Sequence, residues 1–437
     1  MWRESFWKHS FFLAVALLGA APLAAQQPPA QVTAQVAAPE SAAAVPVKLE
    51  DLVGEALAAN PGVQAALRRV EARRRRVPQA KSLPDPVLTV GWMGDPKPFG
   101  VQRQDPSSYR SVGVEQEIPF PGKLKLRGQM ADREAEAAWW EYEDMRRRVV
   151  AEVKAAYYDY FYYDKAIAIT LKNKDLLDKL ARIAEVRYQV GKGIQQDVLK
   201  AHVELSRLRQ RLTVLEQQKE TARARLNTLL DRAPESPLGP PAAFEPVRLT
   251  YALETLYQLA RENDTGLQRE QRLIERGQLA VNLARKEYYP DFGVGYMYQN
   301  RPLLPEMHGF TFSLNIPVFY KSKQREGVNE ATQELLASER SRESREATLY
   351  FEVKQEYLAA KAADELARLY SAVIVPQSSL ALESALAAYE VGTVDFLTLL
   401  ESYATVLDYE VDYYRELANY QIALARLEPL VGVELTK

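Results

Sequence analysis

A short run of polar side chains near the C-terminus has the spacing to act on cations. Asp395, Thr398 and Glu401 follow one another at three-residue intervals, which places them on one face of a predicted helix. Carboxylates gathered in this way can hold cations. A solvated acidic helix face has the same spacing, so both interpretations stay open from these residues alone.

Other reactive groups are scarce. The 437 residues contain no cysteine, which excludes disulfides, thiolate metal sites and cysteine nucleophiles. His9, His202 and His308 are isolated and do not have the spacing of a ligand set. No Gly-rich phosphate loop, Ser-His-Asp set or pair of catalytic carboxylates stands out, and the formal net charge of −2 gives little attraction to nucleic acid. The sequence predicts no enzyme, no cofactor, no resident metal site and no nucleic-acid partner.

The N-terminus has the pattern of an export signal. Residues 1–25 carry early basic side chains, then a short apolar run, then small residues suited to cleavage. A membrane anchor is the alternative, but a spanning helix needs about 20 apolar residues. Residues 26–46 are rich in Ala, Pro, Gln and Val and are predicted to be a flexible segment.

The rest of the chain contains the same order of parts twice, offset by about 200 residues. Glu152-Val153-Lys154 returns as Glu352-Val353-Lys354, for example. We interpret residues 47–232 and 249–433 as two structural repeats, joined by a Pro-rich linker at 233–248.

Each repeat is predicted to contain a long helical hairpin. Residues 129–190 contain neither Gly nor Pro and are rich in helix-forming residues. The hairpins cover 121–232 and 319–431 and turn at Val-Gly pairs. Shorter amphipathic helices are predicted near 49–80 and 251–287.

Four strands are predicted ahead of the hairpins, near 87–93, 109–118, 292–299 and 308–316. In each, aliphatic or aromatic residues alternate with small or polar ones, and Glu115 and Glu117 fall on the polar face. A half-buried sheet in a soluble domain gives the same alternation. A sheet in lipid cannot keep open edges, and four strands cannot close a barrel, so several chains would have to share one.

This combination resembles the TolC family of outer-membrane efflux and secretion channels. The resemblance covers residues 49–433 and is strongest at 388–401, at Gln116 to Lys123 and at Asn60-Pro61. It implies an α+β membrane protein: a homotrimeric TolC-like channel with a 12-stranded β-barrel, four strands per chain, continued by a long α-helical barrel. It also implies the outer membrane of a Gram-negative-type bacterium, with helices in the periplasm and outer-membrane lipid around the strands. The partners would be a periplasmic adaptor (membrane fusion) protein and an inner-membrane pump of RND or ABC type.

The resemblance also implies roles for residues at the hairpin ends. The turns at Val190-Gly191 and Val391-Gly392 would dock the adaptor. A periplasmic gate would contain Asp395, Thr398 and Glu401, although the family has an acidic residue where Thr398 stands. Tyr389 and Asp197 match two positions that lock family tips shut. Val394 replaces the family's arginine, which leaves Gln196 as the donor expected near Tyr389.

Two functions remain from the sequence. The first is the outer-membrane exit duct of a tripartite efflux or secretion system, and the alternative is a periplasmic coiled-coil adaptor or scaffold. Residues 119–123 are similar to heavy-metal branches of the family, but the lumen-facing strand positions are expected to lack clusters of Met, His or Cys. The substrate therefore stays open.

Overall fold

The structure is a computed structural model that describes residues 46–102, 105–244 and 246–436. The predicted signal at 1–25 and nearly all of the predicted flexible segment at 26–46 lie outside these residues.

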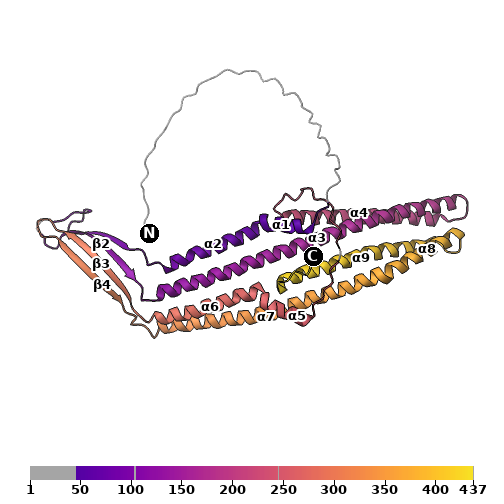
Figure 1. Ribbon diagram of the computed structural model, residues 1–437. Coiled ribbons are helices and arrows are strands. Elements are labelled where there is room, and N and C mark those ends of the chain that lie inside the picture. Colours follow the sequence, from indigo (N-terminus) through magenta and orange to yellow (C-terminus); the bar gives the residue numbers. More distant parts are fainter. Residues whose placement is uncertain (1–45, 103–104, 245, 437) are drawn as a thin grey trace, which may run out of the picture. The chain divides into compact units, whose positions relative to one another are not determined.

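The two halves of the chain have the same order of elements: two short helices, two strands and then a long helical hairpin (Figure 1). The first half contains α1 Leu49–Ala59, α2 Pro61–Lys81, β1 Val87–Met93, β2 Tyr109–Ile118, α3 Lys123–Gln189 and α4 Gln195–Leu229. The second contains α5 Leu253–Asn263, α6 Thr265–Lys286, β3 Asp291–Asn300, β4 Met307–Asn315, α7 Gln324–Leu369, the π-helical turn η1 Tyr370–Ile374, α8 Val375–Val391 and α9 Phe396–Val431.

Each expected amphipathic helix is two helices in the structure. Asn60 separates α1 from α2 because Pro61 cannot donate to the preceding turn, and the Asn60 side chain accepts from the Gly62 and Val63 amides. Asp264 caps α6 in the same way by accepting from the Leu267 amide at 2.7 Å. None of the helices in the described part of the chain is both long and apolar enough to cross a membrane.

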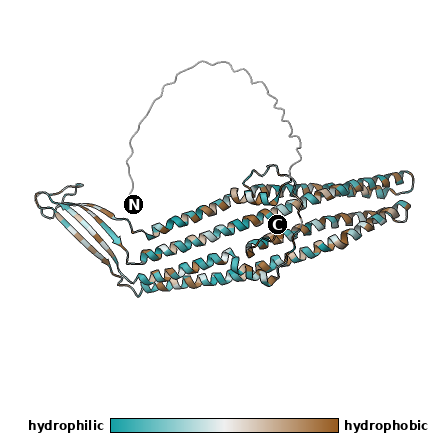
Figure 2. Ribbon diagram, viewed as in Figure 1, coloured by the Kyte–Doolittle hydropathy of each residue, from teal (hydrophilic) through white to brown (hydrophobic). Residues whose placement is uncertain are grey.

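The strands form one antiparallel sheet in the order β1-β2-β3-β4. The register places Val90, Val112, Tyr298 and His308 on one face and Gly91, Ser111, Gln299 and Met307 on the other. Hydrophobic and hydrophilic residues alternate along the strands (Figure 2). Both edges of the sheet, β1 and β4, are open in the single chain.

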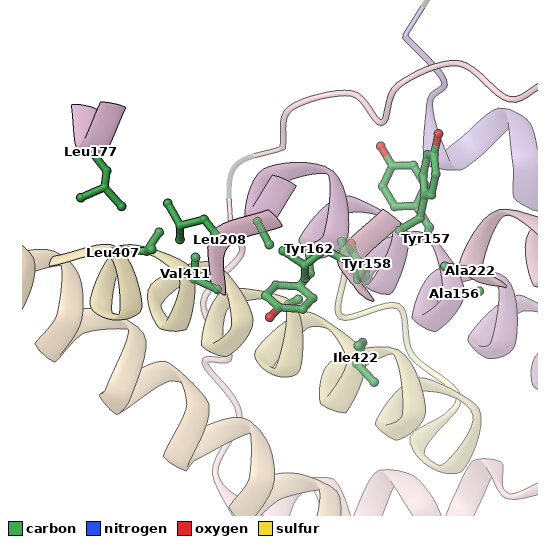
Figure 3. Close-up of a cluster of buried hydrophobic side chains, with 14 of the residues drawn as sticks. Ala156, Tyr157, Tyr158, Tyr162, Leu177, Leu208, Ala222, Leu407, Val411 and Ile422 are labelled. Carbon is green, nitrogen blue, oxygen red and sulfur yellow. The ribbon is translucent and has the colours of Figure 1, made fainter. Parts of the chain in front are cut away.

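The core lies among the helices, with α3 at its centre. This helix packs against α2, α4, α6 and α9. The aromatic run from Tyr157 to Tyr162 is buried here apart from Asp159, and Figure 3 shows part of the cluster with Leu208 and Val411. The burial of this run shows that its aromatic side chains pack between helices.

The tyrosine hydroxyls of this core also hold the segment that connects the two halves. The Tyr157 hydroxyl donates to the carbonyls of Val47 and Ala242 at 3.2 Å, and Val47 forms a parallel bridge with Pro241. Burial raises the pKa of Tyr157 to about 12, so this hydroxyl remains a donor at neutral pH.

A basic run on α2 is solvated. Arg73, Arg74, Arg75 and Arg76 are all exposed, and two of them approach Glu134 at 3.5 to 3.6 Å. Surface pairs of this kind contribute little to stability.

Candidate functional site

The first hairpin turns at Val190 and Gly191. Gly191 has φ of +73°, which L residues adopt at a cost, and the Lys192 amide bonds the Arg187 carbonyl at 2.8 Å. A Cβ at Gly191 would meet nothing within 4 Å, so the constraint on this position is conformational and not steric. Val190 is 62% exposed, an unusual place for a branched apolar side chain unless something covers it.

The second hairpin closes with the same bonds. Gly392 has φ of +83°, and the Thr393 amide bonds the Ala388 carbonyl at 3.0 Å. Val391 is 76% exposed at the apex. The two tips therefore present matching exposed valines on identical backbone turns.

The start of α9 carries the polar residues that the sequence singled out. Asp395 is the N-cap of this helix and accepts from the Thr398 amide at 2.8 Å. Hydrogen bonds from the side chain and then the backbone amide of Thr398 lower the pKa of Asp395. Thr398 and Glu401 are exposed on the following turn, so all three polar groups reach solvent in the single chain.

Tyr389 is 3% exposed and packs against Phe396, with ring centroids 5.6 Å apart. Within the described residues no hydrogen bond joins Tyr389 to Asp197 or Gln196. Gln196 is exposed and Asp197 is half-buried. The structure of one chain thus brings Tyr389 beside a different polar group.

That group is Arg187, near the end of α3. Its guanidinium carbon lies 4.4 Å from the centroid of the Tyr389 ring, and its Nη2 donates to the Glu390 carbonyl at 2.8 Å. Arg187 therefore joins the two hairpins near their tips. Sequence reasoning missed it because it sought a replacement for the arginine at the position of Val394 and did not search the facing helix.

Asp197 and Asp395 form an acidic pair between the starts of α4 and α9. Burial raises the pKa of Asp197, and the charge of Asp395 raises it further, while Lys200 acts in the opposite direction. A proton or a bound cation can reduce the electrostatic repulsion between two such carboxylates.

A second set of acidic residues, Glu115 and Glu117, lies on the sheet. Glu115 pairs with Gly295 and Glu117 with Gly293, on the face that also carries Ser313 and Thr311. Both carboxylates are near the helical end of the sheet and are exposed. The structure thus places them on the small and polar face, as the alternation predicted.

The joint between the sheet and the helices contains a buried cation whose partners the sequence did not reveal. Lys123 is 1% exposed, and its Nζ lies 2.8 Å from Glu287 Oε2 and 2.9 Å from Asp291 Oδ1. Asp291 also accepts from the Phe120 amide at 2.6 Å. The start of α3 is therefore fixed to the start of β3, across about 170 residues of sequence.

Among the described residues, no group of three or more His, Cys, Asp and Glu side chains is arranged to hold a metal ion. The polar residues at the tips and on the sheet line surfaces and do not converge in a closed pocket. Such surfaces can attract and sort ions.

A profile of the family described as Outer membrane efflux protein matches residues 52–232 and 256–433. The chain is 22% identical over 398 residues to the Cobalt-zinc-cadmium resistance protein CzcC of Cupriavidus metallidurans, covering 89% of this chain and 91% of that protein.

Two crystal structures have a similar fold. The outer membrane protein VceC of Vibrio cholerae superposes with a TM-score of 0.74 at 16% identity, covering 89% of this chain and 96% of VceC. The MtrE outer membrane channel of Neisseria gonorrhoeae, solved in its open state, gives 0.75 at 18% identity and covers 89% of each chain.

Proposed function

The chain belongs to the outer membrane efflux protein family, and we propose that three copies of it form the passive exit duct of a tripartite efflux or secretion system. Each copy contributes four strands to a 12-stranded barrel in the outer membrane and two helical hairpins to a tube in the periplasm. The two halves of the chain act as structural repeats in this assembly. An inner-membrane pump of RND or ABC type delivers the substrate through a periplasmic adaptor.

The sheet is the observation that carries this proposal. One face exposes large apolar side chains, with Phe310 83%, Phe312 69% and Leu88 69% accessible, while most side chains of the opposite face are small or polar. Lipid covers such a face well, but hydrocarbon does not tolerate the open edges at β1 and β4. Sharing one barrel among several chains satisfies both requirements.

Aromatic side chains at the helical end of the sheet support the same placement. Tyr288, Tyr289, Phe319 and Tyr320 are between 38% and 74% exposed there. Aromatic girdles of this kind mark the membrane interface in barrels. The strands of 7 to 10 residues span about 23 to 33 Å, close to the thickness of the hydrocarbon core.

The far ends of the helices would meet the adaptor and close the duct. Val190 and Val391, held outward by the turns at Gly191 and Gly392, offer matched apolar contacts for the adaptor. Asp395 and Glu401 of three copies would form acidic rings at the periplasmic mouth, separated by Thr398. Gln196, Asp197 and Tyr389 would take part in closing it.

We further propose heavy-metal cations as the substrate. The similarity to a cobalt-zinc-cadmium resistance protein motivates this choice, and the acidic groups at the mouth and at Glu115 and Glu117 suit cations. Deleting the gene from its host should lower tolerance to cobalt, zinc or cadmium salts, and Glu401→Gln should restore less tolerance than the wild type does.

The shared barrel can be tested by cross-linking, which the absence of cysteine makes specific. Thr89→Cys on β1 and Thr311→Cys on β4 place one thiol on each edge strand. Within one chain these strands are about 14 Å apart, so a shorter bismaleimide linker should connect only neighbouring chains. Membranes containing the double variant should yield covalent dimers and trimers, and either single variant should yield no trimers.

Two outcomes would contradict the proposal. The first is a double variant that stays monomeric after cross-linking while both thiols react with a monofunctional maleimide. The second is a protein recovered freely soluble from the periplasm, which would favour the coiled-coil adaptor or scaffold.

A further inference from the structure

Three methionines stand on the polar face of the sheet. Met93 pairs with Tyr109, Met297 with Gly113 and Gly309, and Met307 with Gln299. They share this face with Glu115, Thr311 and Ser313. The chain has six methionines, one of them the initiator, so more than half of the others lie on a face that should contact water. The expectation that lumen-facing positions lack a methionine cluster is wrong.

Met297 and Met307 are diagonal neighbours on β3 and β4. Met297 pairs directly with Gly309, two residues after Met307, and diagonal Cα atoms are about 7 to 8 Å apart, within reach of long side chains. The Gln299 amide lies 3.8 Å from the Met297 sulfur, and Gln299 is the direct partner of Met307. The Met297 sulfur therefore lies near Gln299, the residue that pairs with Met307.

Packing does not explain these side chains. Met297 lies between two glycines: a Cβ built at Gly113 would be 3.7 Å from its Cγ, and one at Gly309 would be 4.0 Å from its Cε. Met93 is 53% exposed and Met307 46%. Methionine usually fills gaps in apolar cores, but here Met297 is paired with glycines and Met307 with a glutamine.

The chemistry of a thioether indicates what the cluster would bind. Its sulfur is a soft, uncharged ligand that suits Cu(I) and, by the same softness, Ag(I), whereas carboxylates suit harder cations. The hard ligands Glu115 and Glu117 lie at the helical end of this face, and the three methionines lie toward its loop end. The face therefore changes from hard to soft ligands along its length.

The open edges add a third sulfur. Met93 is the last residue of β1 and Met307 the first of β4, so both stand at the loop end of an edge strand. In a shared barrel in which β4 of one copy pairs with β1 of the next and their loop ends are aligned, the neighbour's Met93 would lie beside Met307.

We propose that the loop end of the lumen holds a thioether site for soft monovalent cations, formed by Met297 and Met307 of one copy and Met93 of the next. This inference rests on the shared barrel of the proposed function and adds soft monovalent cations to the heavy-metal cations proposed there. Three copies make three such sites around the lumen.

Silver ion is the probe, because it has the softness of Cu(I) and does not undergo redox change in aerobic buffer. The purified trimer in detergent is titrated with silver nitrate in chloride-free buffer by isothermal calorimetry. Leucine replaces methionine because it keeps the apolar volume and removes the sulfur. Met297→Leu with Met307→Leu should weaken silver binding at least tenfold, and Met93→Leu alone should weaken it severalfold.

Matched controls separate the site from background. Met130→Leu and Met145→Leu remove thioethers from α3 and should leave the affinity unchanged. The chain has no thiol to compete for silver. X-ray absorption of the Cu(I)-loaded trimer should show sulfur neighbours in the wild type and lose them in the double leucine variant.

Failure of this site and failure of the duct give different results. If the trimer forms and conducts but the double leucine variant binds silver as the wild type does, the thioether site is refuted and the duct stands. If only Met93→Leu is without effect, the contribution from the next copy is refuted. If no trimer forms, the proposed function itself fails.

Discussion

Loss of the contact between Arg187 and Tyr389 should loosen the periplasmic tip. The guanidinium group covers the Tyr389 ring at 4.4 Å and donates to the Glu390 carbonyl at 2.8 Å. Tyr389 is itself nearly fully buried against Phe396. Arg187→Met removes the charge and the donors and keeps an unbranched apolar stem of similar reach.

The size of the effect follows from these two contacts. A hydrogen bond from a charged donor contributes about 1.5 to 3 kcal/mol, and a cation over an exposed aromatic ring contributes about 0.5 to 1 kcal/mol. Arg187 is only half-buried, so solvent screening reduces both contributions. A net loss of about 1 to 2 kcal/mol changes a two-state equilibrium about 5- to 30-fold. The open fraction of a closed duct should rise by that factor.

Single-channel recording in planar bilayers measures this change directly. Arg182→Met, on the same helix and exposed, is the control and should leave the open fraction unchanged. Arg187→Lys keeps the charge but not the planar guanidinium group, so its open fraction should lie between those of the wild type and Arg187→Met. Equal open fractions for wild type and Arg187→Met, with the trimer intact in both, would refute the reasoning.

Three further predictions concern the joint, the mouth and the acidic pair. Lys123→Met leaves Asp291 and Glu287 without their cation and should lower the free energy of unfolding by about 2 to 3 kcal/mol. This loss is smaller than for a fully buried pair because the Glu287 side chain is 39% exposed. Thermal unfolding followed by circular dichroism measures the loss, with Lys125→Met at an exposed position as the control. Glu401→Gln should reduce the preference for cations and the block by multivalent cations added on the periplasmic side, measured as reversal potential in a salt gradient; if Glu117→Gln changes them instead, the selective acids are in the barrel. The folded state raises the pKa of Asp197 and so favours its protonated form. The stability of the tip should therefore be highest at acid pH and fall as pH rises through that pKa. Hydrogen exchange of the α4 amides at about pH 4 and pH 7 should show this difference in the wild type and not in Asp197→Asn.

Local signals in the sequence predicted the strands and the turns. Alternation located β1 and β2 at their observed bounds and β3 and β4 to within one residue. Gly191 and Gly392 were recognised because left-handed backbone needs glycine. These features depend on a few neighbouring residues, so one sequence is enough to find them.

Contacts between distant segments were not predictable in this way. Arg187 and Tyr389 are about 200 residues apart, and nothing local in α3 marks one arginine among many. Lys123 belongs to a motif that the sequence did reveal, but its partners Glu287 and Asp291 are named only by the fold. The roles of the tip residues as docking surface and gate stay predictions.

The methionine cluster was missed for a more specific reason. The expected fourth strand began at residue 308, so Met307 fell outside it, although β4 begins at this residue. Met93 and Met297 lie inside the expected first and third strands, at positions that alternate with the apolar residues. Register, and not composition, assigns a side chain to one side of a sheet.

The proposed lumen contains two kinds of cation ligand that respond differently to salt. Carboxylates such as Glu401 and Glu117 attract cations through charge, over a distance that falls from about 10 Å at 0.1 M salt to about 3 Å at 1 M. A thioether bonds through its lone pair and carries no charge to screen. Raising sodium nitrate to about 1 M should therefore shrink the difference in selectivity between wild type and Glu401→Gln. The difference in silver affinity between wild type and the Met297→Leu, Met307→Leu variant should persist. If high salt removes both differences together, silver is held by the general negative potential of the lumen, and the methionines do not bind it.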